Sequence, residues 1–263
     1  MRLKLQSGLS LGYRTRGAGR LVVLLHPVGT RAAFWDPAVE RLAGECRTLA
    51  VDFRGHGESD TPSRPFTLDD LASDIIELLE VQGARDAVLV GCSLGGMVAQ
   101  GVALRAPQTL AGIVLADTNH EQSDAGRTAM TQRAAASLKG MPNVVETTIE
   151  RWFPAAFRAK EPQVVARVRD WLLEDDPVVF SWCWEAIRGL AYGDALSRIA
   201  LPALVLRGAE DAASAREPMQ AMAKLLPRGR FVEIPGAGHA APYEQPDAFV
   251  ALLREFLKSL PGK

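Results

Sequence analysis

The sequence predicts an α/β protein in which a mostly parallel, doubly wound sheet carries an inserted helical segment. Short apolar stretches recur along the first part of the chain and alternate with helical patterns, which is typical of βαβ units. From about residue 119 to about residue 197 the strand-like stretches disappear and only helical patterns remain. We therefore predict a core built from residues 1–118 and 198–263, with residues 119–197 forming a helical cap.

The strands are predicted in chain order from turns and from continuous apolarity. Leu3 to Gln6 and Leu9 to Thr15, divided by Ser7-Gly8, indicate an opening hairpin. The later strands other than the last should be mainly apolar, because helices cover both faces of a doubly wound sheet. They are expected at residues 21–25, 48–51, 87–90, 112–115, 203–206 and 230–234.

Two helices of the predicted core have recognisable starts. Thr67 can cap a helix because an acidic residue, Asp70, follows three positions later. The helix that closes the chain is expected to begin at Pro246. Apolar residues at helical spacing give both helices one buried face: Leu71, Ile75, Leu78 and Leu79 in the first, and Phe249, Val250, Leu253 and Leu257 in the second.

Composition narrows the class of protein and its partners. The 30 basic and 31 acidic side chains leave a net charge of −1, which argues against nucleic acid or an anionic membrane as partner. No apolar run approaches the roughly 20 residues that span a bilayer, and the N-terminus lacks a signal peptide's apolar segment. Three scattered cysteines favour a reducing compartment. We expect a cytoplasmic protein that binds a small molecule, and homo-oligomerisation stays open.

The segment Gly91-Cys92-Ser93-Leu94-Gly95 has the G-x-S-x-G pattern of a nucleophile elbow. It follows a predicted buried strand and leads into a helical pattern, which is the context that this motif requires. Glycines are needed because the turn is tight, and the following helix N-terminus favours negative charge near the serine. We predict that Ser93 is a nucleophile, with a capping serine in a glycine-rich turn as the alternative.

A serine nucleophile needs a base and an acid that orients the base. Among the four histidines, His239 follows the last predicted strand in a loop of small residues, at the sheet edge where Ser93 is expected. Asp211 follows the strand at 203–206, which gives the chain order Ser, Asp, His. Asp117 also follows a strand at this edge and stays the alternative to Asp211.

Two backbone amides are candidates for stabilising a developing oxyanion. One belongs to Leu94, directly after the predicted nucleophile. The other belongs to Val28 in the loop after the strand at 21–25, because the preceding Pro27 has no N–H. In the same loop we interpret His26 as a structural residue, and Thr30 could bind substrate or serve its own backbone.

The segment 52–59 gathers Asp, Arg, His and Ser within eight residues. It has no serine elbow, and its two glycines suggest a tight turn held by charged side chains. We predict a structural loop without a catalytic role.

These motifs resemble the α/β-hydrolase superfamily, from the opening hairpin to the closing helix. The matching stretches are residues 26–30, 52–59 and 91–96, the loop that contains Asp211, and Gly238-His239. The resemblance implies an α/β-hydrolase fold. It also implies a serine hydrolase that cleaves carboxylic esters or lactones in two steps, without a metal or an organic cofactor.

A narrower similarity links the chain to the 3-oxoadipate enol-lactonases. It rests on residues 26–30, on Phe34-Trp35-Asp36-Pro37 and on Arg151-Trp152-Phe153 in the predicted cap. The similarity implies that the cap offers a cation to the carboxylate tail of a lactone, with Arg151 at the matching position. A solvated surface arginine is the alternative. We predict Arg151, Trp152 and Thr30 as substrate-binding residues.

Other functions remain open on the same residues. Carbon–carbon bond hydrolases, perhydrolases and acyltransferases use the same serine triad and differ in their pockets. A ligand receptor without turnover can also keep the fold. The complete set of Ser93, Asp211 and His239 argues against that receptor, since binding alone does not need all three.

Overall fold

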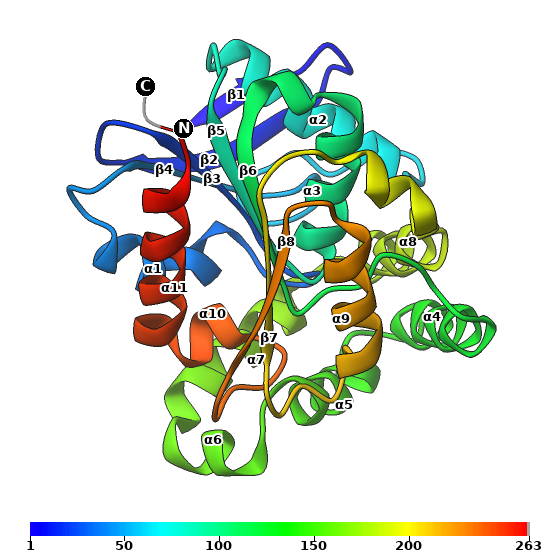
Figure 1. Cartoon of the computed structure of the whole chain (residues 1–263). Helices are drawn as coiled ribbons and strands as arrows, with labels where there is room; N and C mark the ends of the chain where they lie inside the picture. Colours follow the sequence, from blue (N-terminus) through cyan, green and yellow to red (C-terminus); the bar gives the residue numbers. More distant parts are fainter. Residues whose placement is uncertain (262–263) are drawn as a thin grey trace.

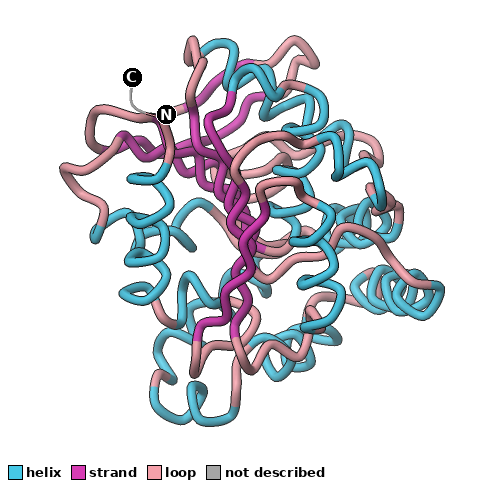
Figure 2. Tube along the Cα trace, viewed as in Figure 1, coloured by secondary structure: helices cyan, strands magenta, loops and turns pink. Residues whose placement is uncertain are grey.

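Eight strands form one sheet in the order β1-β2-β4-β3-β5-β6-β7-β8, in a computed structural model that describes residues 1–261 (Figures 1 and 2). The first two strands pair antiparallel with each other, and β2 pairs antiparallel with β4. All other pairings are parallel. The strands are β1 Arg2–Lys4, β2 Ser10–Arg16, β3 Leu21–Leu25, β4 Arg47–Val51, β5 Ala87–Cys92, β6 Leu110–Ala116, β7 Ala203–Gly208 and β8 Gly229–Ile234. The predicted hairpin and mostly parallel sheet are confirmed, with strand ends within about two residues of those expected.

Helices cover both faces of the sheet, as a doubly wound arrangement requires. In Figure 1, α1 and α11 lie together on one side, and α3 and α9 lie on the other. α2 packs against α3. The helices of these two layers are α1 Asp36–Arg41, α2 Leu68–Val81, α3 Leu94–Arg105, α9 Arg216–Leu225 and α11 Pro246–Ser259, with the short α10 Ala241–Glu244 before the last. Short 3₁₀ turns occur at Ala32–Trp35, Pro107–Thr109 and Gly193–Arg198.

The two predicted helix starts are confirmed. Thr67 accepts the Asp70 N–H at 3.1 Å and Asp70 accepts the Thr67 N–H, which forms the capping box of α2. α11 begins at Pro246. The predicted apolar faces are buried except at Leu257, which is only partly buried.

Between β6 and β7 the described chain contains helices and no strand. These helices are α4 Asp124–Ser137, α5 Pro142–Trp152, α6 Ala155–Lys160, α7 Pro162–Glu174 and α8 Pro177–Arg188. An isolated antiparallel bridge between Glu121 and Ala191 joins the two ends of this insertion. In Figure 1, α5, α6 and α7 lie beyond the end of the sheet that β7 and β8 reach. The insertion therefore stands at the edge where parallel strands place their functional loops.

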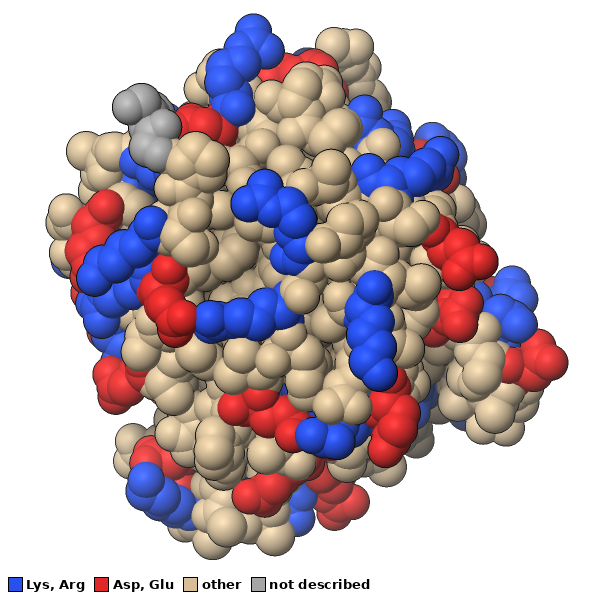
Figure 3. All heavy atoms as spheres, viewed as in Figure 1, with Lys and Arg blue, Asp and Glu red and all other residues tan. Residues whose placement is uncertain are grey.

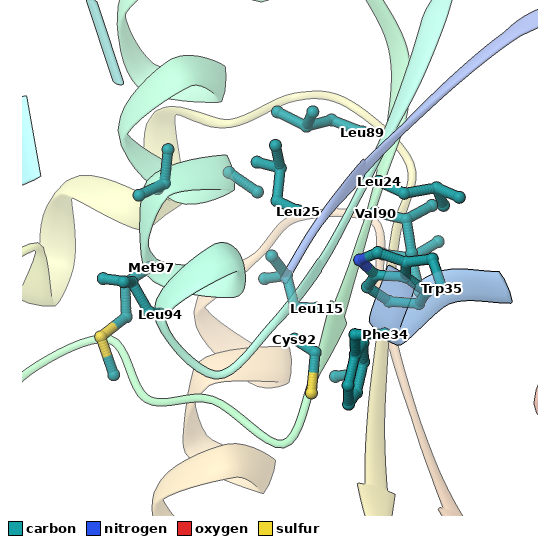
Figure 4. Packing of buried hydrophobic residues seen from close by; sticks show 14 of the residues in the cluster. Leu24, Leu25, Phe34, Trp35, Leu89, Val90, Cys92, Leu94, Met97 and Leu115 are labelled. Carbon is teal, nitrogen blue, oxygen red and sulfur yellow. The ribbon is translucent and has the colours of Figure 1, made fainter. Parts of the chain in front are cut away.

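The central strands are buried on both faces, which makes this edge of the sheet rigid. All five residues of β3 are buried, as are all six of β5. Figure 4 shows Phe34 and Trp35 to one side of these strands, and Leu94 and Met97 of α3 to the other. Burying each large apolar side chain stabilises the fold by about 1.5–3 kcal/mol. The loops that follow β3 and β5 thus start from fixed positions.

Surface charges are mixed, as the balanced composition predicts. Figure 3 shows basic and acidic side chains interspersed on the face in view. Ion pairs such as Arg254–Glu45 and Arg41–Asp247 join separate segments on the surface. Of the helices that the structure describes, none has the length and apolarity needed to cross a bilayer.

A buried ion pair ties the loop after β4 to α2. Arg54 donates to both carboxylate oxygens of Asp74, at 2.7 and 2.6 Å, and the two side chains are only 6% and 5% exposed. Removing one partner of such a pair leaves a charge without compensation in a region of low dielectric constant.

We therefore predict that Asp74→Ala lowers the free energy of unfolding by about 3–5 kcal/mol. The matched control is Glu146→Ala, since Glu146 makes a similar two-pronged pair with Arg169 while its side chain is 62% exposed. The control should lose no more than about 1 kcal/mol. Urea unfolding followed by circular dichroism measures both. Equal losses in the two variants would contradict the prediction.

Candidate active site

Ser93 lies in a strained turn between β5 and α3. Its backbone has φ +52° and ψ −115°, a conformation that non-glycine residues rarely adopt. Its N–H donates to the carbonyl of Ala116, and its carbonyl accepts from the hydroxyl of Thr118 at 2.7 Å, so β6 and the following loop hold the turn. A Cβ on Gly95 would lie 2.1 Å from the carbonyl oxygen of Leu25, which explains why glycine is needed there. The predicted elbow is present.

A continuous chain of hydrogen bonds runs from Ser93 to Asp211. His239 Nε2 lies 2.9 Å from Ser93 Oγ, and its Nδ1 lies 3.0 Å from Asp211 Oδ2. The Asp211 carboxylate can only accept, so Nδ1 carries the proton and Nε2 is free to accept the hydroxyl proton of Ser93. The three residues are 7%, 4% and 4% exposed. The arrangement can take a proton from Ser93 in a site that largely excludes water.

Asp211 is held as a charged carboxylate. Its Oδ1 accepts the N–H groups of Ala213 and Ser214, at 2.6 and 3.0 Å. Burial raises the pKa of Asp211, but the charge and hydrogen bond of His239 and these two amides outweigh burial, so its pKa lies below the ordinary value. A charged Asp211 stabilises an imidazolium at His239.

Asp117, the alternative to Asp211, makes no hydrogen bond to His239. Its Oδ1 accepts the Gly208 N–H at 2.7 Å, and its Oδ2 accepts the Ala241 N–H at 3.0 Å. Burial, followed by the charge of Asp211, raises the pKa of Asp117 well above its ordinary value. Asp117 therefore ties together the ends of the loops that carry Asp211 and His239.

The amides of Val28 and Leu94 are free of hydrogen bonds to other residues that the structure describes. Leu94 is the first residue of α3, so its N–H has no partner within the helix. Val28 follows β3, the neighbour of β5 in the sheet. Both amides are thus available donors next to strands that end at the Ser93 edge.

Two buried, neutral histidines hold the Val28 loop. His26 Nε2 accepts the Phe53 N–H at 3.0 Å, and His56 Nε2 accepts the Gly29 N–H at 3.2 Å. Their Nδ1 atoms face the carbonyls of Pro27 and Arg54. Burial, as the main cause, lowers the pKa of His26 to about 4 and that of His56 to about 3. The structural interpretation of His26 is confirmed.

The segment 52–59 is likewise a structural loop, as predicted. Asp52 Oδ1 accepts the Ala32 N–H at 2.6 Å, and its Oδ2 accepts the Glu58 N–H at 3.0 Å. The Ser59 hydroxyl donates to the carbonyl of Asp52. These bonds use the polar groups of the loop within the fold.

The predicted substrate contact Thr30 is engaged elsewhere. Thr30 is only 1% exposed, and its hydroxyl donates to the carbonyl of Pro27 at 2.9 Å. It therefore serves its own turn, which was the alternative interpretation. This bond leaves its hydroxyl hydrogen unavailable to a substrate.

Trp152 and Arg151, at the end of α5, lie close to the histidine. The carbonyl of Trp152 accepts the His239 N–H at 2.8 Å, and the two rings are 5.6 Å apart. The indole N–H of Trp152 and the Nε of Arg151 are buried without a hydrogen-bond partner in the described structure. Burial, followed by the charge of Arg133, lowers the pKa of Arg151 to about 10. Arg151 is thus a partly buried cation rather than a solvated one.

Sequence reasoning missed Glu244, which holds the histidine loop. Its Oε1 accepts the N–H groups of Gly238 and Ala240, the residues on either side of His239, each at 3.0 Å. Burial raises the pKa of Glu244 to about 8. The only sequence signal is an acidic residue five positions after His239 in an otherwise apolar segment.

The described residues contain no group of three or more His, Cys, Asp or Glu side chains that could hold a metal ion. The acids around His239 instead accept hydrogen bonds from backbone amides.

Comparison with known proteins identifies relatives along nearly the whole chain. The model of the alpha/beta hydrolase family matches residues 22–252. 3-Oxoadipate enol-lactonase 2 of Acinetobacter baylyi is 27% identical over 246 residues, which is 92% of this chain and 90% of that protein.

Two solved structures have closely similar folds. A thermophilic esterase from Thermogutta terrifontis, solved with malate bound, has a TM-score of 0.92 and 30% identity, and 98% of each chain is covered. The enol-lactonase from Burkholderia xenovorans LB400 has a TM-score of 0.91 and 28% identity, covering 98% of this chain and 100% of that one. The predicted fold class is confirmed.

The neutral histidines lead to a prediction about acid stability. The unfolded chain binds protons at His26 and His56 near pH 6.5, but the folded protein does so only near pH 4 and pH 3. Each histidine should therefore reduce stability as pH falls below 6.5, by up to about 1.4 kcal/mol per pH unit. His56→Gln removes one titrating group and keeps an acceptor for Gly29. Urea unfolding between pH 7 and pH 4.5 should give a shallower slope for the variant, and parallel slopes would refute the assignment.

Glu244 should change the pH dependence of stability in the opposite direction, reducing the free energy of unfolding as pH rises. Its pKa is raised in the folded protein, so the folded state holds a proton that the unfolded state releases above about pH 4.5. Stability contributed by the protonated form is therefore lost as pH rises from 4.5 toward 8. We predict that Glu244→Gln, which keeps the oxygen that accepts both amides, gains stability relative to the wild type as pH rises. A pH-independent difference between the two unfolding free energies would contradict this.

Proposed function

This chain belongs to the α/β-hydrolase family, and on that premise we propose that it hydrolyses small carboxylic esters or lactones by a Ser-His-Asp mechanism. The observation that carries the proposal is the unbroken line from Ser93 Oγ through His239 to Asp211, with hydrogen bonds of 2.9 and 3.0 Å. An enol-lactone is the preferred substrate class. Both the Acinetobacter relative and the Burkholderia structure are enol-lactonases.

In the first step Ser93 attacks the carbonyl carbon of the substrate. Its hydroxyl proton passes to His239 Nε2 as the new C–O bond forms, and Asp211 stabilises the imidazolium. The carbonyl oxygen becomes an oxyanion, for which the amides of Leu94 and Val28 are the proposed donors. Collapse of the tetrahedral intermediate breaks the bond to the leaving oxygen, which takes the proton from His239.

In the second step water releases the acyl group from Ser93. His239 Nε2 takes a proton from the water as it attacks the ester carbonyl, and returns that proton to Ser93 Oγ when the acyl–serine bond breaks. A lactone yields a hydroxy acid. An enol-lactone yields an enol that becomes a ketone, which helps to make ring opening irreversible.

The proposed substrate carries a carboxylate. Arg151 is a partly buried cation one residue away from Trp152, whose ring and carbonyl contact His239. The Thermogutta esterase was solved with malate, a small dicarboxylate. A small anionic molecule is therefore the partner we propose, in place of nucleic acid or a membrane.

The test is turnover of 3-oxoadipate enol-lactone beside a set of p-nitrophenyl esters, with Ser93→Ala as control. We expect kcat/KM above about 10⁴ M⁻¹s⁻¹ on the lactone, and loss of that activity in the variant. Asp211→Asn should lower kcat by up to about 10⁴-fold. Asp117→Asn is the comparison and should lower kcat less than Asp211→Asn does, because Asp117 holds the neighbouring loops and makes no bond to His239.

Each other outcome is informative. Ester turnover without lactone turnover would keep the serine hydrolase and reject the lactonase. Failure of both substrates would favour carbon–carbon bond hydrolysis or a receptor without turnover. A serine-directed fluorophosphonate tests whether Ser93 is an activated nucleophile: labelling would favour carbon–carbon bond hydrolysis, and no labelling would favour the receptor.

A further inference from the structure

Two arginines from different helices of the insertion converge on one aromatic ring. The guanidinium carbon of Arg133, on α4, lies 5.1 Å from the centroid of the Trp184 ring on α8. That of Arg151, on α5, lies 5.6 Å from the same centroid. All three residues line a cavity of about 290 Å³ between these helices. The cavity is large enough for a small anionic group.

Neither arginine has an acidic partner among the described residues. Other arginines of the insertion do: Arg127 pairs with Asp124 and Arg169 pairs with Glu146. The lining of the cavity contains no Asp or Glu. Two cations therefore face one space without an anion of the protein to neutralise them.

Two buried polar groups in the lining of the cavity lack a hydrogen-bond partner among the described residues, and both are donors. The Nε of Arg151 and the indole N–H of Trp184 are buried without an acceptor, and Trp184 is 4% exposed. Leaving a buried donor without a partner costs about 1–3 kcal/mol, so a ligand that supplies acceptors would recover this free energy. A carboxylate supplies two acceptor oxygens and the negative charge that the cavity lacks.

The two guanidinium groups also repel each other. Burial and, after it, the charge of Arg133 lower the pKa of Arg151 to about 10, and burial lowers the pKa of Arg133. Arg151 still carries its charge at neutral pH. An anion placed between the two would relieve the repulsion.

Arg151, which lines the cavity, also lies near the catalytic residues. Arg151 precedes Trp152, whose carbonyl accepts the His239 N–H at 2.8 Å. The charge of Asp211 also acts on Arg151. Ser93, Asp211 and His239 do not line the cavity themselves, so a substrate held by Arg151 has to extend past Trp152 to reach Ser93.

We propose that Arg133 and Arg151 jointly bind one carboxylate of the substrate against Trp184, and that Arg133 determines specificity for anionic substrates. This inference rests on the proposed ester or lactone hydrolysis and adds a residue on α4 that lies outside the Arg151-Trp152-Phe153 segment. Arg133 acts on the remote end of the substrate and takes no part in bond cleavage.

The experiment compares two esters with the same leaving group, p-nitrophenyl hemiglutarate, which is anionic, and p-nitrophenyl butyrate, which is neutral. Arg133→Met should lower kcat/KM for the anionic ester by about 10- to 100-fold, because a hydrogen bond to a charged group is lost. The neutral ester should change less than about twofold. Arg133→Lys keeps the charge and should recover part of the loss. Arg127→Met, on the same helix, is the matched control and should affect neither ester.

Equal effects of Arg133→Met on both esters, or no effect on either, would overturn the proposal. Absence of any Ser93-dependent turnover would instead refute the proposed hydrolysis, and the anion site is then tested by binding. Titration calorimetry with glutarate at low salt should give a Kd at least about tenfold weaker in Arg133→Met than in the wild type. Equal affinity in the two proteins would overturn the anion site independently of catalysis.

Discussion

The close approach of α3 to the carboxyl ends of β3 and β5 is the constraint on which the site depends. No side chain fits between Gly95 and the carbonyl of Leu25, where a Cβ would lie at 2.1 Å. The chain must therefore reverse within one residue, and Ser93 takes the strained backbone conformation that lifts its side chain out of the turn. The surrounding strands are wholly buried and can hold this strain. The Leu94 N–H at the start of α3, which has no partner among the described residues, and the Ser93 hydroxyl beside it are two results of one packing contact.

Three buried carboxyl groups surround His239, and their backbone partners give them different roles. Asp211 keeps a low pKa because it faces the histidine and two amides. Asp117 and Glu244 have raised pKa values because burial outweighs their amide hydrogen bonds. Three carboxylates could not all be charged in so small a volume. The protein concentrates the negative charge on the one acid that orients the histidine and uses the other two to hold the loops on both sides of it.

The sequence predicts what depends on local pattern. Continuous apolarity located the buried strands, and the elbow was recognised because all of its requirements lie within five residues. The choice between Asp117 and Asp211 stayed open because both follow strands at the same edge, and only the loop geometry turns one of them toward His239. The role of Thr30 stayed open because a threonine at the end of a turn has the same local sequence in either role, and only the structure shows its hydroxyl donating to the carbonyl of Pro27. Glu244 and Arg133 gave no usable signal, since their partners lie on other segments whose placement the sequence does not specify.

The helical insertion is part of the catalytic framework as well as its cover. A Cβ on Gly238 would lie 2.2 Å from the carbonyl of Trp152, so glycine is what allows the histidine loop to touch the end of α5. The resulting bond from the His239 N–H joins the base directly to the helix that carries Arg151. A shift of α5 would therefore move the histidine backbone and the cation together. Recognition of a charged substrate and alignment of the base are thus coupled through a single peptide unit, which requires the insertion to hold one defined position while Ser93 reacts.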